Sequence, residues 1–586
     1  MSQTLRSSIK GALNRSIKGG LLSPAQFRGS TLDLDFAGAK SLKNQIGKKD
    51  VVSFTRASSA TYVGSDGVIQ SAVTNLLLRS EEFLATSWTK GAGVTITLDN
   101  SQGVPFSGVN AYRVDYTGAD QYGPEQLFTY SAVPYAASIW VKGTAGETIR
   151  FAGQTGVSAN NFTLTGQWQR LSLTWTAAAS SNGFVFSTYT GATARTLWIA
   201  AAQLEESSTV GEYVKTTSTI NSAPRFDHDP TTGESLGLLV EEARTNINDY
   251  SVDTSSWTNT TGGSISITLN AGIAPDNTNT ATLIATSTGS GFIGNAASYT
   301  SGSTYTFSAY FKAGTGDQAT ILLTSSGGTA GRWNNGTSNL ERTFDLTNGT
   351  SSTSGFAVPP TDWSIVDAGN GWWRCSITAT ATLTFTATQQ LARNTVGNTT
   401  FYGWGWQIEE GDFATSYIPT TGTALTRSAD DVSITGTNFS SWYNAPEGTL
   451  YYDNTILSAP AVGNQGIVYI SDGTGTDYLG TFVPAQLNHR SVVRFGGVNQ
   501  YLANPILTSD VFNPAKVALA YQENNCISAG NGNLNPLDTS CTIPTVDQLH
   551  LGQPTGSGAE LCTHWKRFTY FPYRLPDANL QTMTTP

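Results

Sequence analysis

The feature that most constrains the fold of this chain is an internal repeat. Four landmarks recur in the same order, the first two after 169 or 170 residues and the last two after 204. The second copy therefore carries 34 additional residues, which lie between Gly314 and Trp372. Such a repeat predicts two copies of one domain within the 586-residue chain. The landmarks are Asn75 to Trp88 against Arg244 to Trp257, Tyr135 to Gly143 against Tyr305 to Gly314, Trp168 to Trp175 against Trp372 to Ala379, and Ala201 to Glu206 against Gly405 to Glu410.

Each copy is predicted to consist of short β-strands. Apolar and polar residues broadly alternate in Ser138 to Lys142 and in Leu171 to Trp175, so one row of side chains faces a core and the other faces outward. Charged residues make up only 13%, against roughly 25% in an average globular protein. We therefore predict an all-β fold of tandem jelly-roll or β-sandwich domains. The additional residues are predicted to form an extra polar hairpin or a long loop.

A third unit follows the repeat. Apolar strand runs separated by turns extend from near Ala445 to the end of the chain, which predicts a second type of sandwich. Near its end, Leu575 to Gln581 places a proline at the start of a short predicted helix that packs on a sheet.

The charge of the chain limits the classes of partner. The formal net charge is −10 and the pI about 5.0, whereas nucleic-acid binding needs lysine and arginine clustered over a broad face. We expect no nucleic-acid partner, and no membrane insertion because no segment approaches the roughly 20 apolar residues of a membrane span. The start of the chain also lacks the apolar core of a signal peptide, so folding in a cytoplasm is expected.

Four cysteines are too few and too unevenly spaced for a disulfide scaffold. Cys526 and Cys541 stand 15 positions apart in a predicted hairpin, where they face one another across two strands. Folding in a reducing cytoplasm favours reduced packing cysteines, and a disulfide between them is the alternative.

No catalytic constellation stands out. Pairs of glutamates invite a glycosidase interpretation, but neighbouring strand residues point to opposite faces and cannot aim both carboxylates at one substrate. Neither a GxSxG turn nor a phosphate-binding glycine loop occurs in the required setting. We therefore predict a protein that is not an enzyme and has no catalytic residues. The pairs are Glu81 and Glu82, Glu205 and Glu206, Glu241 and Glu242, and Glu409 and Glu410.

One acidic stretch admits a metal-site interpretation. Asp227 and Asp229, with His228 between them, offer donors for a hard cation. Aspartate before proline is also typical of a turn, which is the interpretation we favour. We expect no cofactor and no metal ligand, and a structural Ca²⁺ stays an open alternative.

Aromatic residues supply the candidate ligand platforms, because sugar sites stack apolar sugar faces on tryptophan or tyrosine beside amides and carboxylates. Trp333 and Asn335 lie in a polar stretch with no obvious core to enter, although a neighbouring subunit offers another surface for the indole. Tyr402, Trp404 and Trp406 alternate onto one predicted strand face, which suits a platform and suits a sandwich core better. The candidate glycan-binding residues are Trp333, Asn335, Trp404 and Trp406.

Three stretches resemble known families. Phe54 to Ala72 and Ala223 to Asn246 resemble the paired motif of bacteriophage head-spike or tail-fibre proteins, here parted by the first repeat copy. The repeat copies, which end in Gln203 to Thr217 and Gln407 to Thr421, resemble carbohydrate-binding-module-like jelly rolls of phage structural proteins, and this resemblance implies sugar binding. Residues 446 to 583 resemble the laminin-G or concanavalin-A-like lectin sandwiches that close phage fibres.

These resemblances imply a non-enzymatic fibre or spike of a phage virion that attaches to host surface glycans. A head decoration or connector without a ligand and a tailspike-like polysaccharide depolymerase are the alternatives. We expect a homotrimer, since weak single sites for a host polysaccharide gain from several copies acting together. The predicted domains are an N-terminal anchor (1–30), a split collar (31–74 and 219–246), an inserted jelly roll (75–218), a second jelly roll (244–430) and a lectin-like sandwich (440–586).

The anchor is inferred from charge and periodicity. Residues 1–20 carry four cations and no acidic residue, and the apolar positions Leu5, Ile9, Leu13 and Ile17 share helical spacing. Membrane lysis and nucleic-acid binding are alternatives. We favour docking into an acidic socket formed by other virion structural proteins.

Overall fold

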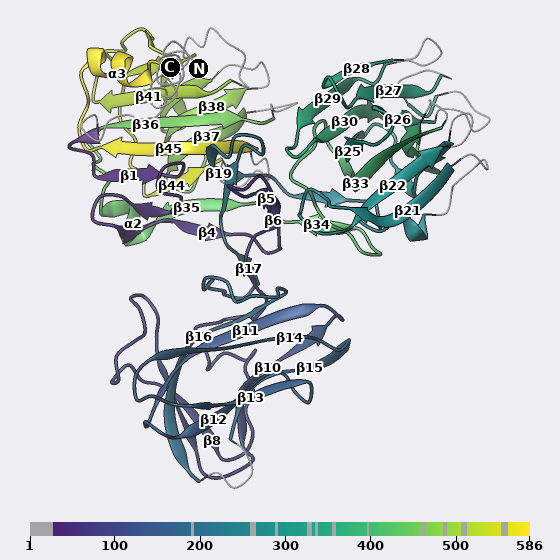
Figure 1. The fold of residues 1–586 in the computed structure, drawn as a ribbon. Helices are drawn as coiled ribbons and strands as arrows, with labels where there is room; N and C mark the ends of the chain where they lie inside the picture. Colours follow the sequence, from purple (N-terminus) through teal and green to yellow (C-terminus); the bar gives the residue numbers. More distant parts are fainter. Residues whose placement is uncertain are drawn as a thin grey trace, which may run out of the picture. The chain divides into compact units, whose positions relative to one another are not determined.

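Strands make up 52% of the computed structural model and helices 3%, which confirms the predicted all-β fold (Figure 1). The chain divides into two compact units. The main unit contains Met1–Phe54, Ala60–Gln70 and Pro224–Pro586, and the inserted unit contains Thr55–Ser59 and Ser71–Ala223. The predicted anchor lies almost entirely outside the described residues, which are 27–188, 193–257, 265–286, 291–324, 331–333, 338–353, 359–394, 398–458, 464–484, 489–504, 513–552 and 561–586.

The inserted unit is a sandwich of two antiparallel sheets. Alternation decides which side chains it buries, since Leu171 and Leu173 are buried whereas Ser172 and Thr174 are exposed. The five-stranded sheet has the order β14 (Gln169–Thr176), β11 (Pro134–Gly143), β16 (Arg195–Glu205), β9 (Tyr112–Tyr116) and β8 (Val94–Leu98). The four-stranded sheet has the order β10 (Tyr122–Tyr130), β15 (Ser180–Ser187), β12 (Thr148–Gln154) and β13 (Ser158–Thr163), and β7 (Thr74–Asn75) pairs with β17 (Asn221–Ser222).

The second jelly roll is a larger version of the same sandwich. Its additional residues include two strands that extend one sheet each. One is β28 (Thr350–Ser352), which forms a hairpin with β27 (Leu340–Asp345), and the other is β29 (Asp362–Asp367), which pairs with β30 (Trp372–Thr380). The six-stranded sheet has the order β21 (Ile265–Gly272), β22 (Ala281–Thr286), β33 (Thr399–Glu410), β25 (Thr304–Ala313), β30 (Trp372–Thr380) and β29 (Asp362–Asp367). The five-stranded sheet has the order β23 (Gly291–Ile293), β32 (Gln390–Asn394), β26 (Gln318–Leu323), β27 (Leu340–Asp345) and β28 (Thr350–Ser352). Two short pairs, β24 (Ala296–Tyr299) with β31 (Phe385–Thr388) and β20 (Arg244–Asn246) with β34 (Leu425–Arg427), and the 3-10 turn η2 (Thr254–Ser256) complete this sandwich.

The two copies also share a hydrogen-bond network. Near the start of each copy, an asparagine Nδ2 donates to two carbonyls on distant segments. In each copy a serine hydroxyl then lies 2.7 Å from a tyrosine hydroxyl. Matching bonds at matching positions identify two copies of one domain. The asparagines are Asn75 and Asn246, the serines Ser80 and Ser251, and the tyrosines Tyr213 and Tyr417.

The C-terminal sandwich draws strands from widely separated parts of the chain. One sheet has the order β18 (Arg225–His228), β19 (Ser235–Val240), β45 (Thr563–Phe571), β36 (Glu447–Ile456), β41 (Ala515–Gln522), β42 (Ile527–Gly530) and β43 (Asn533–Leu534), with β1 (Leu32–Asp35) also on β45. The other has the order β4 (Ser53–Thr55), β35 (Asp431–Thr435), β44 (Gln548–Leu551), β37 (Asn464–Ser471), β38 (Tyr478–Pro484), β39 (Arg490–Phe495) and β40 (Val498–Ala503). Two hairpins, β2 (Lys43–Asn44) with β3 (Lys49–Asp50) and β5 (Thr61–Val63) with β6 (Ile69–Ser71), and the helices α2 (Gly436–Ser440) and α3 (Asp577–Thr584) complete the main unit.

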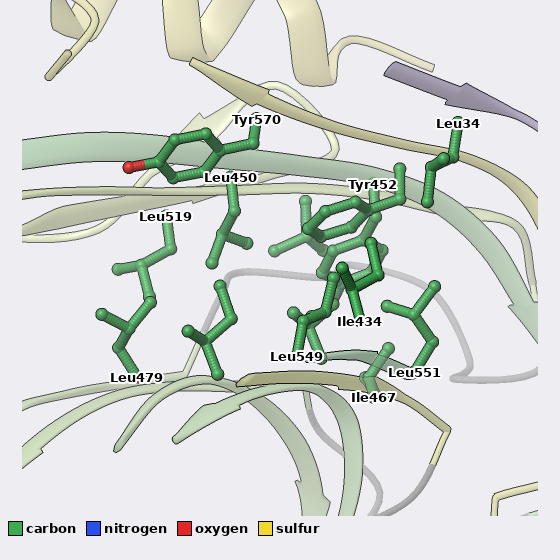
Figure 2. Close-up of a cluster of buried hydrophobic side chains, with 14 of the residues drawn as sticks. Leu34, Ile434, Leu450, Tyr452, Ile467, Leu479, Leu519, Leu549, Leu551 and Tyr570 are labelled. Atoms are coloured by element: carbon green, nitrogen blue, oxygen red, sulfur yellow. The ribbon is translucent and has the colours of Figure 1, made fainter. Parts of the chain in front are cut away.

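Most of the predicted split collar therefore belongs to this sandwich rather than to a separate domain. Leu32 pairs with Tyr570 and Leu34 with Phe568 in an antiparallel register. Figure 2 shows Leu34 within the same buried cluster as Tyr452 and other residues of the C-terminal region. The collar segments complete both sheets because they supply apolar side chains to one continuous core.

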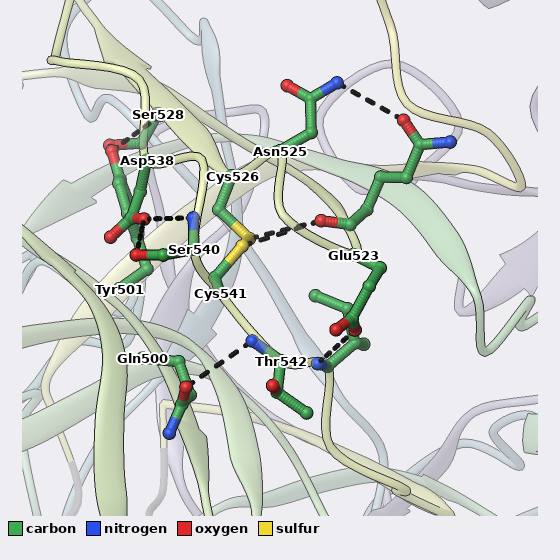
Figure 3. The surroundings of a disulfide bond; sticks show 12 residues. Gln500, Tyr501, Glu523, Asn525, Cys526, Ser528, Asp538, Ser540, Cys541 and Thr542 are labelled. Carbon is green, nitrogen blue, oxygen red and sulfur yellow. Dashed lines mark hydrogen bonds between the residues drawn. A yellow bond between two sulfur atoms is a disulfide. The ribbon is translucent and has the colours of Figure 1, made fainter.

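Cys526 and Cys541 form a disulfide bond, which corrects the expectation of reduced cysteines (Figure 3). The chain turns after β41, and Cys526 then bridges to Asp538, which brings the following loop alongside. The two Cα atoms lie 6.5 Å apart, within bonding reach of a disulfide. Local loop geometry thus decides the pairing, whereas Cys375 and Cys562 stay buried as free thiols.

The described part of the chain contains no helix with the length and apolar character needed to cross a membrane.

Candidate functional site

A cavity of about 470 Å³ lies in the main unit, within the range of about 300–1,000 Å³ typical of ligand pockets. We call it the collar pocket, because residues of the predicted collar form part of its wall. Its walls come from the β5–β6 hairpin, from β18 and β19, from β25, β29 and β30, and from the segment 412–417. Leu457 and His564 of the C-terminal sandwich also line it. The site thus combines segments that lie as far apart in the sequence as residues 61 and 564.

A carboxylate–imidazole pair forms one polar part of the wall. The Asp227 Oδ2 atom lies 2.8 Å from His564 Nε2, and Oδ1 accepts a hydrogen bond of 2.7 Å from Val63 N. His228 lies beside them, with Nδ1 3.1 Å from Val63 O. Asp227 therefore holds the β5 strand, β18 and β45 together at the pocket.

Arg374, on β30, forms another polar part of the wall. Its Nη2 donates to Thr415 O at 2.5 Å and to Ser308 Oγ at 3.5 Å, and the guanidinium lies 5.5 Å from the centre of the Tyr310 ring. Among the described residues, its Nε has no hydrogen-bond partner and no carboxylate forms an ion pair with it. The Nε atom is buried, so a ligand oxygen in the pocket can meet only the accessible part of the guanidinium, which is a donor without a carboxylate partner in the described part of the chain.

Five aromatic side chains line the pocket, and two of them, Tyr310 and Tyr417, are buried. Tyr62 and Phe413 are half-buried, and Trp363 is 39% exposed, with Arg342 packed 3.8 Å from the centre of its ring. Burial raises the pKa of Tyr62, and the nearby carboxylates Asp227 and Asp66 raise it further. The Tyr62 hydroxyl is therefore protonated at neutral pH and can both donate and accept hydrogen bonds.

Exposed carboxylates give the pocket an acidic border. Asp362, Asp367 and Asp412 line it and are exposed. Arg374 is the only arginine or lysine among the residues that line it. Hydroxyl-rich neutral ligands suit such a site better than anions, which the three carboxylates repel.

A buried ion cluster adjoins the pocket, and its member Glu241 is one of the lining residues. We call Arg225, Glu241, Arg427 and Asp430 the arginine–carboxylate cluster. Arg225 Nη1 lies 2.6 Å from Glu241 Oε2, Arg225 Nη2 lies 2.5 Å from Asp430 Oδ2, and Arg427 Nη1 lies 3.0 Å from Glu241 Oε2. Glu241 also accepts hydrogen bonds from Ser416 N and Oγ, at 2.8 and 2.6 Å. The cluster therefore fixes the segment 412–417 to Glu241, the residue that follows β19.

Burial by itself raises the pKa of the Glu241 carboxyl, but Arg427, Arg225 and the Ser416 hydrogen bonds hold it well below its ordinary value of 4.5. A carboxyl with a depressed pKa contributes stability that is fully present above its unfolded pKa and is lost as the pH falls below that value. We therefore expect the loss of stability caused by Glu241→Gln to be largest at pH 7 and to shrink on acidification from pH 5 to pH 3. Urea unfolding of both proteins at pH 7, 5, 4 and 3 measures this difference, and a constant difference would contradict the charge assignment.

The structure places Trp333 inside the second jelly roll. Its side chain is 0% exposed, and the ring lies 5.0 Å from that of Tyr299 and 5.3 Å from that of Phe385. The expectation that this indole has no core to enter is therefore wrong, and its faces are not open to a sugar. Asn335 lies outside the described residues.

Trp404 and Trp406 are also buried, at 1% and 0% exposed, but on different sides of the sheet. The ring centre of Trp404 lies 4.6 Å from that of Tyr417, whereas the ring centre of Trp406 lies 5.0 Å from that of Trp257 in the sandwich core. A bulge at Gly405, with φ +64°, breaks the alternation that predicted one shared face. Neither indole offers a surface platform.

The acidic stretch 227–229 forms a turn and a buried pair. Asp229 Oδ1 accepts hydrogen bonds from Thr231 N and Thr232 N, as in the turn that we favoured, while Asp227 binds His564. Across the described ranges, no group of three or more histidine, cysteine, aspartate or glutamate side chains is arranged to hold a metal ion.

Sequence reasoning weighed three residues that line the collar pocket, Asp227 and His228 as metal donors and Glu241 in a glutamate pair, but it selected none of the others. Tyr62, Arg374 and His564 carry no local signature, because each belongs to an ordinary strand. The available signal for the site was the long collar-like run of residues 54–72 and 223–246. This run marks two of the segments that form the pocket, but it does not show which other segments pack against them.

No model of a known protein family matches the chain. No curated protein matches its sequence. Solved structures similar to part of it include the CBM40 of the Ruminococcus gnavus IT-sialidase bound to α2,3-sialyllactose, at 16% identity over 24% of this chain and 84% of that one, with a TM-score of 0.22. The binding domain of botulinum neurotoxin DC in complex with rat synaptotagmin II is similar at 12% identity over 27% of this chain and 40% of that one, with a TM-score of 0.22. At these identities and scores the likenesses carry no argument about the site.

Proposed function

We propose that the chain is a fibre or spike component of a phage virion that binds neutral cell-surface saccharides in the collar pocket without cleaving them. The observation that carries the proposal is the composition of this one cavity. Tyr62, Trp363 and Phe413 supply aromatic surface, Arg374 supplies a guanidinium that has no carboxylate partner among the described residues, and the carboxylates of the border supply acceptors. Flat apolar surface beside a few fixed polar groups is the arrangement that orients a sugar ring.

The virion part of the proposal is supported by the resemblance of residues 54–72 and 223–246 to phage head-spike and tail-fibre proteins. A homotrimer held through its N-terminus by other virion proteins multiplies weak sites, which raises the avidity for a polysaccharide. A head decoration without a ligand and a polysaccharide depolymerase are the alternatives that the experiment separates.

A glycan array that prints neutral, amino and carboxylated saccharides tests the proposal with the full chain. We expect capture of neutral saccharides, and a loss of about tenfold or more with Tyr62→Ala or with Arg374→Met, because an aromatic or arginine anchor contributes at least about 1.4 kcal/mol. Tyr122→Ala, an exposed tyrosine of the inserted unit, is the matched control and should bind like the wild type.

A parallel assay follows the release of reducing ends from the captured saccharides. Binding without release supports the proposal. Release would show a depolymerase, and an array on which nothing binds would favour a decoration protein. Capture that neither pocket variant weakens would remove the collar pocket from the function.

A further inference from the structure

The repeat places a second version of the pocket wall on the inserted unit. Arg374, Ser376, Thr378 and Tyr417 line the collar pocket, and the residues at the matching repeat positions are identical in type. Arg374 and its counterpart also make the same kind of hydrogen bond, because each guanidinium donates to the Oγ of a serine on the neighbouring strand. The counterparts in the inserted unit are Arg170, Ser172, Thr174 and Tyr213, and Ser138 is the serine partner.

Aromatic residues gather at the same place in both copies. In the second jelly roll the cluster of Tyr310, Trp372, Trp404 and Tyr417 is almost fully buried. In the inserted unit the matching cluster contains Trp140, Trp168 and Tyr213, which are all half-buried. The centre of the Phe106 ring lies 6.0 Å from that of Trp140 and 5.8 Å from that of Tyr213. We call Phe106, Trp140, Trp168, Arg170 and Tyr213 the outer aromatic face.

Two differences leave the outer aromatic face open. Trp404 of the second copy is replaced by Ala200, so the indole that fills this position is missing from the inserted unit. Ser172 and Thr174 are exposed there, whereas their counterparts Ser376 and Thr378 are buried.

The backbone beneath the face is held in an unusual conformation. Strand β16 has a bulge opposite Ser138 and Trp140, where Ala201 has φ +50°, and Gly405 has φ +64° at the same point of the second copy. Glycine adopts such a conformation freely, whereas alanine does so at a cost. A strained residue retained next to an aromatic cluster is typical of sites where the backbone re-aims side chains for a ligand.

The charges around the face suit hydroxyl groups. Arg170 is half-buried and forms no carboxylate ion pair among the described residues, and burial lowers its pKa while Glu205 and Glu212 oppose that change. Glu212 is exposed, whereas Glu205 is buried and accepts hydrogen bonds from Gln203 and Gly211. One guanidinium and one free carboxylate beside three indole or phenol rings supply donors, an acceptor and an apolar surface.

We propose that the outer aromatic face of the inserted unit is a second saccharide-binding site, for the same neutral class of sugar as the collar pocket. The ligand class rests on the proposed function, whereas the location of the site rests on the repeat. The chain then carries two sites in separate units, and both contribute to avidity on a polysaccharide.

The test uses the full chain on an array of printed neutral saccharides. With the collar pocket disabled by Tyr62→Ala and Arg374→Met, capture should persist at reduced avidity, and adding Trp140→Ala or Arg170→Met should lower it by about tenfold or more. Leu127→Ala, at an exposed leucine on the other sheet of the same unit, is the matched control. Arg170→Met keeps the aliphatic stem, so it serves if Trp140→Ala fails to fold.

The second site would be overturned if the pocket-disabled chain captured no saccharide. It would also be overturned if that chain captured saccharide and neither variant changed the capture. A change of oligomeric state with Trp140→Ala or Arg170→Met, measured by light scattering, would overturn it too, because the face would then be a contact between copies. If these two variants weaken capture while the collar-pocket variants do not, the second site stands and the pocket function fails.

Discussion

Replacing Glu241 by glutamine should lower the free energy of unfolding of the main unit by about 3–5 kcal/mol at pH 7, the range for breaking a buried ion pair from one side. The Arg225 and Arg427 side chains are 0% and 1% exposed, and both lie within 3.0 Å of Glu241 Oε2. Glutamine leaves these two cations with Asp430 as the nearest remaining carboxylate of the arginine–carboxylate cluster. Hydrogen exchange measured in each unit separately reports the change, and the inserted unit is the internal reference.

Asp50→Asn is the matched control for this prediction. Asp50 also faces a cation, Lys43, at 3.6 Å, but the two side chains are 72% and 51% exposed. Exposed pairs contribute about 0–1 kcal/mol, so the control should change little. An effect of Glu241→Gln as small as that of the control would mean that the cluster does not brace the main unit.

Trp333→Ala should destabilise the second jelly roll by about 3–5 kcal/mol, the cost of removing a fully buried tryptophan. The indole is 0% exposed and packs against Tyr299, Phe307 and Phe385. The expected result is faster hydrogen exchange in β25 and β30, with the inserted unit unchanged.

Trp363→Ala serves as the comparison, because that indole is 39% exposed and should cost about 1 kcal/mol or less. A mild effect of Trp333→Ala, together with a loss of saccharide capture at unchanged stability, would instead support the role that the sequence predicted for this residue.

The sequence predicted the fold class because alternation is a local property of each strand. Leu171 to Trp175 shows it directly, with leucines inside and serine and threonine outside. The repeat was equally visible, since its landmarks keep their order and their spacing up to the additional residues. The assignment of strands to particular sheets could not be predicted, because the pairing of Leu32 with Tyr570 joins residues at opposite ends of the chain.

The candidate glycan residues failed for two physical reasons. Trp333 enters a core that is formed by strands far from it in the sequence, so local polarity misrepresents its surroundings. Trp404 and Trp406 are separated by the bulge at Gly405, and the glycine between two tryptophans was the signal that could have predicted it. The collar pocket arises from tertiary pairing alone, so no local pattern marks Tyr62 or Arg374.

Saccharide binding in the collar pocket is tested most directly by an experimental structure of the full chain bound to the saccharide that the array selects. We expect density for a sugar ring in the collar pocket, with the ring against Tyr62 and a hydroxyl oxygen within 3.2 Å of the Arg374 guanidinium, a normal hydrogen-bond distance. An empty collar pocket in a chain that carries the saccharide elsewhere would contradict this expectation.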